Sequence, residues 1–137
     1  MHITESDLAA RAITARQFAY APYSGFTVGA ALLCKDGTIY TGCNVESAAF
    51  APTVCAERTA FVKAVSEGKR DFAAIAITGG KQGTPGDYCY PCGVCRQVIA
   101  EFCSGAFTVL IVRTPTDWQK ITLEELLPHR FGPDSLQ

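Results

Sequence analysis

Short apolar runs alternate along this chain with segments of helical periodicity. Four runs are expected to form strands, the first two joined as a hairpin by the turn Lys35-Asp36-Gly37: 28–33, 38–45, 72–78 and 106–112. Three segments are expected to form the longer helices: 4–20, 55–67 and 92–102. Residues 79–91 are rich in glycine and proline and predict a loop, and Thr122-Leu123-Glu124-Glu125 opens a short helix with a capping-box pattern. Strands that alternate with helices predict a sheet covered on both faces, which is an α/β sandwich.

The length and charge of the chain limit its expected partners. Its 137 residues, 48% of them hydrophobic, suit one domain that spans 1–137 around one core. The formal net charge is −1 and the basic residues are scattered, so we do not expect nucleic acid as a partner, because phosphate contacts require a basic stripe. No apolar run approaches the length of a membrane span, and we expect no membrane partner. Seven cysteines, an odd count, without a secretion signal at the first residues predict reduced thiols and a cytoplasmic location.

Two cysteine motifs suggest a metal site. Cys92 and Cys95 are three residues apart at the start of a predicted helix, so that their sulfurs share one face and could hold one edge of a tetrahedral site. Taken alone, this pair could equally be a redox dithiol or two small buried residues. A catalytic zinc ion takes three protein ligands, and the histidines of this chain, His2 and His129, lie near its ends. Cys55, also at a predicted helix start, is therefore the expected third ligand.

Charged residues beside these cysteines have expected roles of their own. Glu57 follows Cys55 by two residues and can point into the site without binding metal, which suits a group that moves protons. Three thiolates and Zn²⁺ leave one excess negative charge, which helix N-termini would offset. Arg58 and Arg96 are expected to support the site from behind the ligands by donating hydrogen bonds to sulfur.

Five segments of the chain resemble the cytidine deaminases of the small, homotetrameric type. They run through nearly the whole chain in the order of that family: Phe26-Thr27-Val28-Gly29-Ala30-Ala31, Asn44-Val45-Glu46, Cys55-Ala56-Glu57-Arg58-Thr59-Ala60, Pro91-Cys92-Gly93-Val94-Cys95-Arg96-Gln97-Val98 and Glu125-Leu126-Leu127-Pro128-His129-Arg130-Phe131. The resemblance implies a three-layer α/β/α sandwich with a mixed five-stranded sheet and one Zn²⁺ per subunit. It also implies a homotetramer with active sites shared between subunits. The implied activity is the hydrolytic deamination of cytidine and deoxycytidine to uridine and deoxyuridine with release of ammonia, a step of pyrimidine salvage.

The resemblance further implies where the nucleoside binds. Residues matching Asn44 and Glu46 hydrogen-bond the ribose, and the backbone at Ala56 faces the pyrimidine carbonyl. Phe26 and Phe131 pack on the base, the latter from a neighbouring subunit. Physically, Asn44 and Glu46 are two apart at a strand end and share a face, and aromatic rings suit a flat base.

This chain departs from the family pattern at two positions and leaves other functions open. Phe50 stands where the family usually has tyrosine, and Tyr90 where many relatives have serine, which could alter loop packing and substrate preference. A deaminase of another cytosine nucleoside, such as blasticidin S, would share the zinc motifs. The remaining alternatives are a thioredoxin-like redox pair and a structural zinc module closed by Cys89 as a fourth ligand.

Overall fold

Five strands form one mixed sheet in the computed structural model, which describes residues 2–137 and leaves Met1 outside. Their bounds are β1 Phe26–Cys34, β2 Ile39–Cys43, β3 Phe72–Lys81, β4 Thr108–Thr114 and β5 Asp117–Thr122. The order across the sheet is β2-β1-β3-β4-β5, with β3 and β4 parallel and every other pair antiparallel. A parallel pair needs a crossover connection, and the segment carrying α3 (Gly93–Phe102) provides it.

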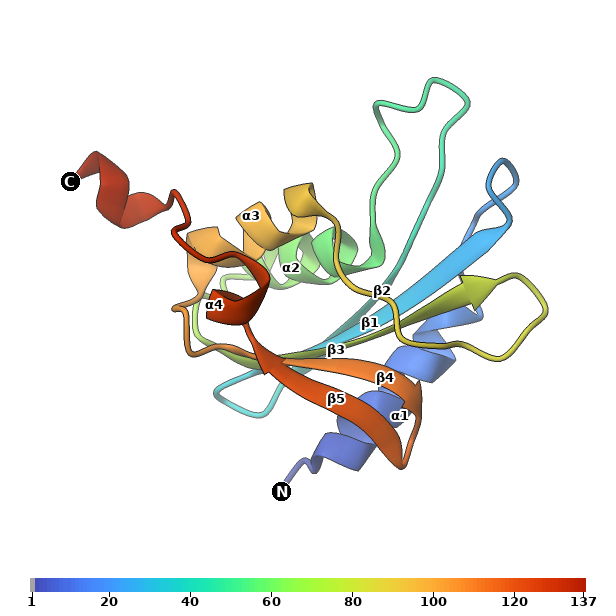
Figure 1. Cartoon of the computed structure of the whole chain (residues 1–137), viewed down its shortest axis with the longest axis horizontal. Helices are drawn as coiled ribbons and strands as arrows, with labels where there is room; N and C mark the ends of the chain where they lie inside the picture. Colours follow the sequence, from blue (N-terminus) through green and yellow to red (C-terminus); the bar gives the residue numbers. More distant parts are fainter. Residues whose placement is uncertain (1) are drawn as a thin grey trace.

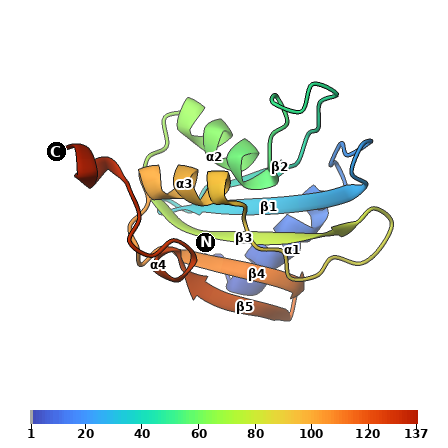
Figure 2. The same ribbon diagram turned by 45° about the horizontal axis from the view of Figure 1, so that its top comes forward.

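The helices cover both faces of this sheet (Figures 1 and 2). Helix α1 (Glu5–Arg16) lies on one face, and α2 (Ala56–Ser66) and α3 lie side by side on the other. A short α4 (Leu123–Leu126) and a 3₁₀ turn (Pro133–Leu136) follow the last strand. The three-layer α/β/α sandwich with a mixed five-stranded sheet is therefore confirmed. No helix within residues 2–137 combines the length and apolar character needed to cross a membrane.

Separate apolar cores form under the two helical layers. On the α1 face, small helix residues such as Ala9 and Ala12 pack on Ala76 and Leu110 of the sheet. On the opposite face, the larger core includes Phe61 of α2, which is fully buried against the rings of Phe72 and Phe107. Because α2 and α3 both pack into this larger core, their N-termini are held at one end of the sheet.

Two glycines let the helices approach the sheet closely. A Cβ at Gly29 of β1 would lie 2.1 Å from the Ala12 carbonyl oxygen, and one at Gly42 of β2 would lie 2.4 Å from the Ala56 carbonyl oxygen. Any side chain at Gly42 would therefore displace the first turn of α2. This contact sets the position of the α2 N-terminus above β2.

The structure differs from the sequence-based expectations mainly at the ends of elements. Helix α1 stops at Arg16 rather than at residue 20, and β3 continues through Gly79 to Lys81 within the stretch expected to be loop. Strand β5 has no counterpart among the four apolar runs, because its residues are mostly polar and partly exposed. The capping box that Thr122 and Glu125 predict is present at the start of α4.

Candidate metal and catalytic site

Cys55 and Cys92 occupy equivalent places at the starts of α2 and α3. Each is the N-cap residue, with extended backbone angles of φ −76°, ψ 157° for Cys55 and φ −67°, ψ 168° for Cys92. The Cys92 sulfur accepts a hydrogen bond from the Cys95 amide at 3.5 Å. The first amides of a helix lack intrahelical partners and carry partial positive charge, so both N-termini favour thiolates.

The structure brings together the three sulfurs that the sequence predicts as ligands. Within residues 2–137, Cys55, Cys92 and Cys95 form a group whose sulfurs all lie within 4.8 Å of one another. The Cys92 sulfur is 3.8 Å from that of Cys55 and 3.4 Å from that of Cys95. A tetrahedral ion with Zn–S bonds of about 2.3 Å separates its sulfurs by about 3.8 Å, and this thiol cluster therefore fits zinc.

Cys89 does not join the thiol cluster in the described part of the chain. Its sulfur lies instead against β3, 2.9 Å from where a Cβ of Gly79 would stand, and burial raises the pKa of the Cys89 thiol to about 11. Three ligands without a fourth protein donor are the arrangement of a catalytic zinc site rather than a structural one.

Arg58 supports the thiol cluster from the side of α2. Its Nη2 donates to the Thr53 carbonyl at 3.2 Å and lies 3.9 Å from the Cys55 sulfur. Hydrogen bonds from Cys95, then Arg58 and Cys92, lower the pKa of the Cys55 thiol to about 5. The hydrogen bond with Cys55, followed by burial, raises the pKa of the Cys95 thiol. Arg58 thereby offsets part of the negative charge that three thiolates would gather.

Arg96 contacts backbone rather than sulfur, which corrects the expected hydrogen bond. Among residues 2–137, its guanidinium donates from Nε to the Pro91 carbonyl at 2.8 Å and from Nη1 to the Leu126 carbonyl at 2.5 Å. The side chain thereby ties Pro91, the residue before Cys92, to the last residue of α4. The Arg96 amide also donates to the Cys92 carbonyl at 2.9 Å, so the contacts of Arg96 near the ligand are with backbone atoms.

Glu57 is the buried acid of the site, with 4% of its surface exposed. Its Oε1 is buried and has no hydrogen-bond partner within residues 2–137. Burial, and next to it the negative charge at Cys55, raise the pKa of this carboxyl above its usual value. A buried carboxyl oxygen without a partner costs free energy unless a ligand satisfies it, which indicates that it faces a ligand position.

The two polar side chains expected at the sugar lie on the segment after β2 and already bind the backbone. Asn44 accepts from the Val28 amide and donates to the Phe26 carbonyl, both at 2.8 Å. Glu46 accepts from the amides of Tyr23 and Ser24 at 3.0 and 3.1 Å and from the Ser24 hydroxyl. Hydrogen bonding by Ser24 lowers the pKa of Glu46, so this carboxyl is ionised at neutral pH. Ser24 is a contact that the sequence alone did not indicate.

The remaining site candidates differ sharply in exposure. Ala56 is fully buried at the first position of α2, whereas Phe26 and Phe131 are 41% and 59% exposed. Phe131 belongs to the C-terminal segment that extends away from the sheet beyond α3 and α4 (Figure 1). Its carbonyl accepts a hydrogen bond from Gln97 of α3 at 2.7 Å. The two aromatic rings therefore expose apolar surface to which this chain offers little cover.

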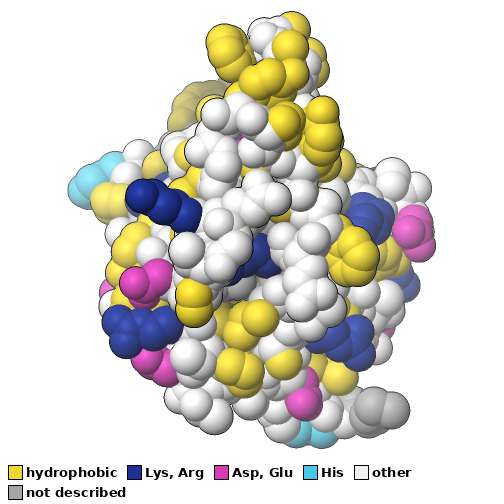
Figure 3. All heavy atoms as spheres, turned by 90° about the vertical axis from the view of Figure 1, so that its right-hand side faces the viewer, with side chains coloured by type: hydrophobic (Ala, Val, Ile, Leu, Met, Phe, Trp, Pro, Cys, Tyr) yellow, Lys and Arg dark blue, Asp and Glu magenta, His cyan; other side chains and the backbone are white. Residues whose placement is uncertain are grey.

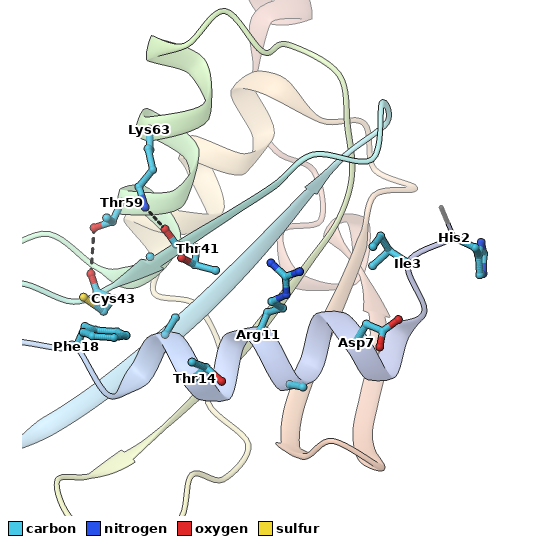
Figure 4. Close-up of a pocket in the computed structure, with 13 residues that line it drawn as sticks. His2, Ile3, Asp7, Arg11, Thr14, Phe18, Thr41, Cys43, Thr59 and Lys63 are labelled. Carbon is cyan, nitrogen blue, oxygen red and sulfur yellow. Dashed lines mark hydrogen bonds between the residues drawn. The ribbon is translucent and has the colours of Figure 1, made fainter.

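Of two concave surfaces, one lies apart from the predicted site residues and the other includes Glu46. A groove of about 810 Å³ lies between α1, β2 and α2 and is lined by Arg11, Phe18 and Lys63 among others (Figure 4); none of the predicted site residues lines it. A smaller pocket of about 250 Å³ is formed by Tyr23 and Phe50 with polar residues that include Glu46. The chemistry of the chain therefore lies away from the larger groove.

Comparisons with known proteins identify the family. Residues 3–111 match the model of the cytidine and deoxycytidylate deaminase zinc-binding region. The chain is 50% identical over 129 residues to the cytidine deaminase of Sporosarcina psychrophila, covering 94% of this chain and 92% of that protein. It is 32% identical over 108 residues to the blasticidin-S deaminase of Bacillus cereus, covering 76% of each.

A solved structure gives the same answer for the fold. The crystal structure of cytidine deaminase from Burkholderia pseudomallei superimposes with a TM-score of 0.84 at 42% identity, covering 93% of this chain and 99% of that one. Residues 3–111, which match this zinc-binding region, include Cys55, Cys92 and Cys95, the three thiols that the structure brings together. The resemblance expected from the sequence is confirmed, and the chain belongs to the zinc-binding cytidine and deoxycytidylate deaminase family.

Proposed function

We propose that this protein hydrolyses cytidine and deoxycytidine to uridine and deoxyuridine with release of ammonia. The observation that carries the proposal is the buried Glu57, whose Oε1 lacks a partner within residues 2–137, beside three converging sulfurs that no fourth protein ligand joins. The 50% identity to a cytidine deaminase over most of both chains supports the choice of substrate.

The reaction needs a nucleophile that attacks C4 of the cytosine ring. It also needs a proton on the ring nitrogen N3 and a proton on the amino group that leaves C4. Zinc held by Cys55, Cys92 and Cys95 would supply a Lewis acid that favours the ionisation of water near neutral pH. Glu57 would take the proton of the attacking water and deliver it to N3, then protonate the departing amine. The C4–O bond forms first, as N3 gains one proton of the water. Glu57 would then take the remaining proton from the new C4 hydroxyl and pass it to the amine, so that the C4–N bond breaks as the C4 carbonyl forms and ammonia leaves.

Burial of Glu57 suits this proton transfer. A carboxyl with an unperturbed pKa is a weak base at neutral pH, whereas a raised pKa makes it a better acceptor and a usable donor in turn. The desolvated position of Glu57 and the nearby negative charge at Cys55 both act in this direction. The same residue can therefore serve both proton transfers without moving far.

We assign sugar recognition to Asn44 and Glu46 and base recognition to Ala56, Phe26 and Phe131. The existing hydrogen bonds of Asn44 and Glu46 leave capacity, since each carboxylate or carbonyl oxygen has two lone pairs and the amide nitrogen has two hydrogens. Ala56 opens α2, where free amides point toward the end of the helix and can meet the pyrimidine carbonyl.

We further propose a homotetramer with shared sites, acting in pyrimidine salvage in the cytoplasm. Exposed large apolar residues support the assembly. Phe26 opens β1, and Tyr20, Tyr23, Val45 and Phe50 lie on the segments that flank β1 and β2. Figure 3 shows hydrophobic side chains gathered where these segments project at the top of the molecule. Apolar patches of this kind mark interaction surfaces.

Zinc quantification and a cytidine assay on one preparation test the proposal. We expect one zinc per chain and conversion of cytidine to uridine, followed by the change in ultraviolet absorption. A parallel assay with blasticidin S compares turnover of this alternative nucleoside with turnover of cytidine, and we expect lower turnover of blasticidin S. A metal-free protein in which Cys92 and Cys95 cycle between dithiol and disulfide would contradict the deaminase function and favour the redox alternative.

A further inference from the structure

The connection from β3 to α3 delivers Cys92 to the thiol cluster. It follows β3 closely at first, since the Asp87 amide donates to the Gly79 carbonyl at 2.8 Å and the Gly79 amide donates back at 3.4 Å. The side chains of the next three residues point in two directions. Cys89 turns its sulfur toward Gly79, while Tyr88 and Tyr90 reach β5.

Tyr88 makes two contacts with the β4–β5 hairpin. Its hydroxyl donates to Asp117 Oδ1 at 2.7 Å, and the Arg113 guanidinium lies 4.8 Å from the centre of its ring. Arg113 also donates from Nε to Asp87 at 3.1 Å and from Nη1 to Asp117 Oδ2 at 3.3 Å. The hydrogen bond to Asp117 raises the pKa of the Tyr88 phenol, so it stays protonated and able to donate. Arg113 therefore contacts both the connection, at Asp87 and Tyr88, and Asp117 of the hairpin.

The opposite end of the same connection has its own anchor. Arg16 of α1 donates to the carbonyls of Lys81 at 2.8 Å and Thr84 at 2.7 Å. Between these anchors lie exposed residues of the loop, and after Tyr88 only Cys89, Tyr90 and the buried Pro91 separate the hairpin contact from Cys92. The position of the Cys92 backbone therefore depends on the contact at Tyr88 more directly than on the one at Arg16.

We propose that Tyr88, Arg113 and Asp117 form a latch that positions Cys92 as a zinc ligand by holding the connection against the β4–β5 hairpin. The latch rests on the proposed zinc site and adds positioning residues to it. Cys55 and Cys92 are both N-caps, but Cys92 is exposed, whereas Cys55 is half-buried and Cys95 is buried within α3. Of the three ligands, Cys92 gains most from an external tether.

The rate of zinc release from the zinc-loaded enzyme tests whether the latch holds Cys92 in place. Tyr88→Phe removes the hydroxyl and keeps the ring, and Asp117→Ala removes the acceptor for both Tyr88 and Arg113. We expect release to a chromogenic chelator to be roughly three- to tenfold faster in each variant, below the 10–100-fold effect of groups that touch the ligand itself. The matched control is Lys120→Ala, which removes the exposed 2.8 Å ion pair of β5 with Glu5 but leaves the latch intact.

Two further variants separate positioning from loss of folding. Asp117→Asn keeps an oxygen that can accept from Tyr88 and should restore most of the zinc retention that Asp117→Ala loses. Combining Tyr88→Phe with Asp117→Ala should accelerate release by less than the product of the single effects, because both act through one contact. Melting temperatures of the single variants should match that of Lys120→Ala within a few degrees.

The outcomes distinguish the latch from the zinc site. A zinc-loaded wild type whose release rate is unchanged by Tyr88→Phe and Asp117→Ala contradicts the latch alone. A wild type that binds no zinc contradicts the proposed function and the latch together. Faster hydrogen exchange across residues 87–96 in Tyr88→Phe, and not in Lys120→Ala, supports the latch independently of activity.

Discussion

Two regions of the candidate site differ in how their polar atoms are used. In the thiol cluster, three sulfurs face one another and Glu57 keeps a buried oxygen without a partner in the described chain. In the region of Asn44 and Glu46, the polar groups already have partners in the same chain, which are backbone groups and the Ser24 hydroxyl. The aromatic residues assigned to the base are largely exposed.

The difference indicates that a single chain arranges the metal ligands and Glu57 more completely than it arranges the residues assigned to nucleoside binding. Cys55, Cys95 and Glu57 lie at the start of helices that pack in the larger core, and the three sulfurs of the thiol cluster lie within 4.8 Å of one another. The nucleoside region needs apolar cover for Phe26 and Phe131, which a neighbouring subunit would supply. We therefore expect substitutions in the thiol cluster to reduce activity most, and substitutions in the nucleoside region to reduce it less.

The largest effect is expected for Cys55→Ala. Loss of one of three ligands should reduce zinc to a small fraction per chain and activity to background, because a site with two thiolates binds zinc weakly. Metal content by elemental analysis and a cytidine assay measure both. Cys43→Ala is the matched control, since Cys43 is another partly exposed thiol near α2 and lies outside the thiol cluster; it should retain full zinc.

Glu57→Gln should separate proton transfer from metal binding. The variant keeps the size of the side chain, so we expect full zinc content, while kcat falls about 10²–10⁴-fold because the proton acceptor is lost. Steady-state kinetics and zinc analysis on the same sample check this. Near wild-type kcat would remove Glu57 from the mechanism.

Glu46→Gln should weaken substrate binding without affecting the metal. A hydrogen bond to a charged group contributes about 1.5–3 kcal/mol, so a fall of roughly 10–10²-fold in kcat/KM is expected, with zinc content unchanged. Glu67→Gln is the control, because Glu67 accepts from Tyr40 at 3.2 Å and is the C-cap of α2, at the opposite end of that helix from Cys55. Equal kinetics for the two variants would contradict a role of Glu46 at the sugar.

Phe131→Ala should give the smallest effect and the sharpest test of shared sites. We expect KM for cytidine to rise about three- to tenfold, because burial of an aromatic ring against the base is partly lost. When this variant is reassembled with excess Glu57→Gln chains, the inactive partner supplies an intact Phe131 and KM should return toward the wild-type value. No change on mixing would show that Phe131 acts within its own chain or not at all.

The sequence predicted the part of the site that depends on local spacing. Cys92 and Cys95 lie where a three-residue spacing at a helix start places them, and both Cys55 and Cys92 are N-caps as the predicted helix bounds imply. Convergence of Cys55 with this pair could not follow from spacing alone. It was inferred from the three protein ligands that a catalytic zinc ion takes, and in the structure it depends on the packing of α2 beside α3.

Features set by tertiary contacts escaped prediction for identifiable reasons. Strand β5 pairs with β4 although its sequence, Asp117-Trp118-Gln119-Lys120-Ile121-Thr122, has no apolar run, because an edge strand buries little of each side chain. Arg96 was expected at sulfur, but the carbonyls of Pro91 and Leu126 lie within its reach and satisfy it. The contacts of Tyr88 with Arg113 and Asp117 join residues far apart in the sequence, and no local pattern signals them.

X-ray absorption at the zinc edge of the purified protein tests the central claim most directly. Three sulfurs at about 2.3 Å and one oxygen at about 2.0 Å are the result expected for a catalytic ion that the thiol cluster holds with one position open to water. Four sulfurs around the ion would contradict the account, because Cys89 would then close the position that the chemistry requires.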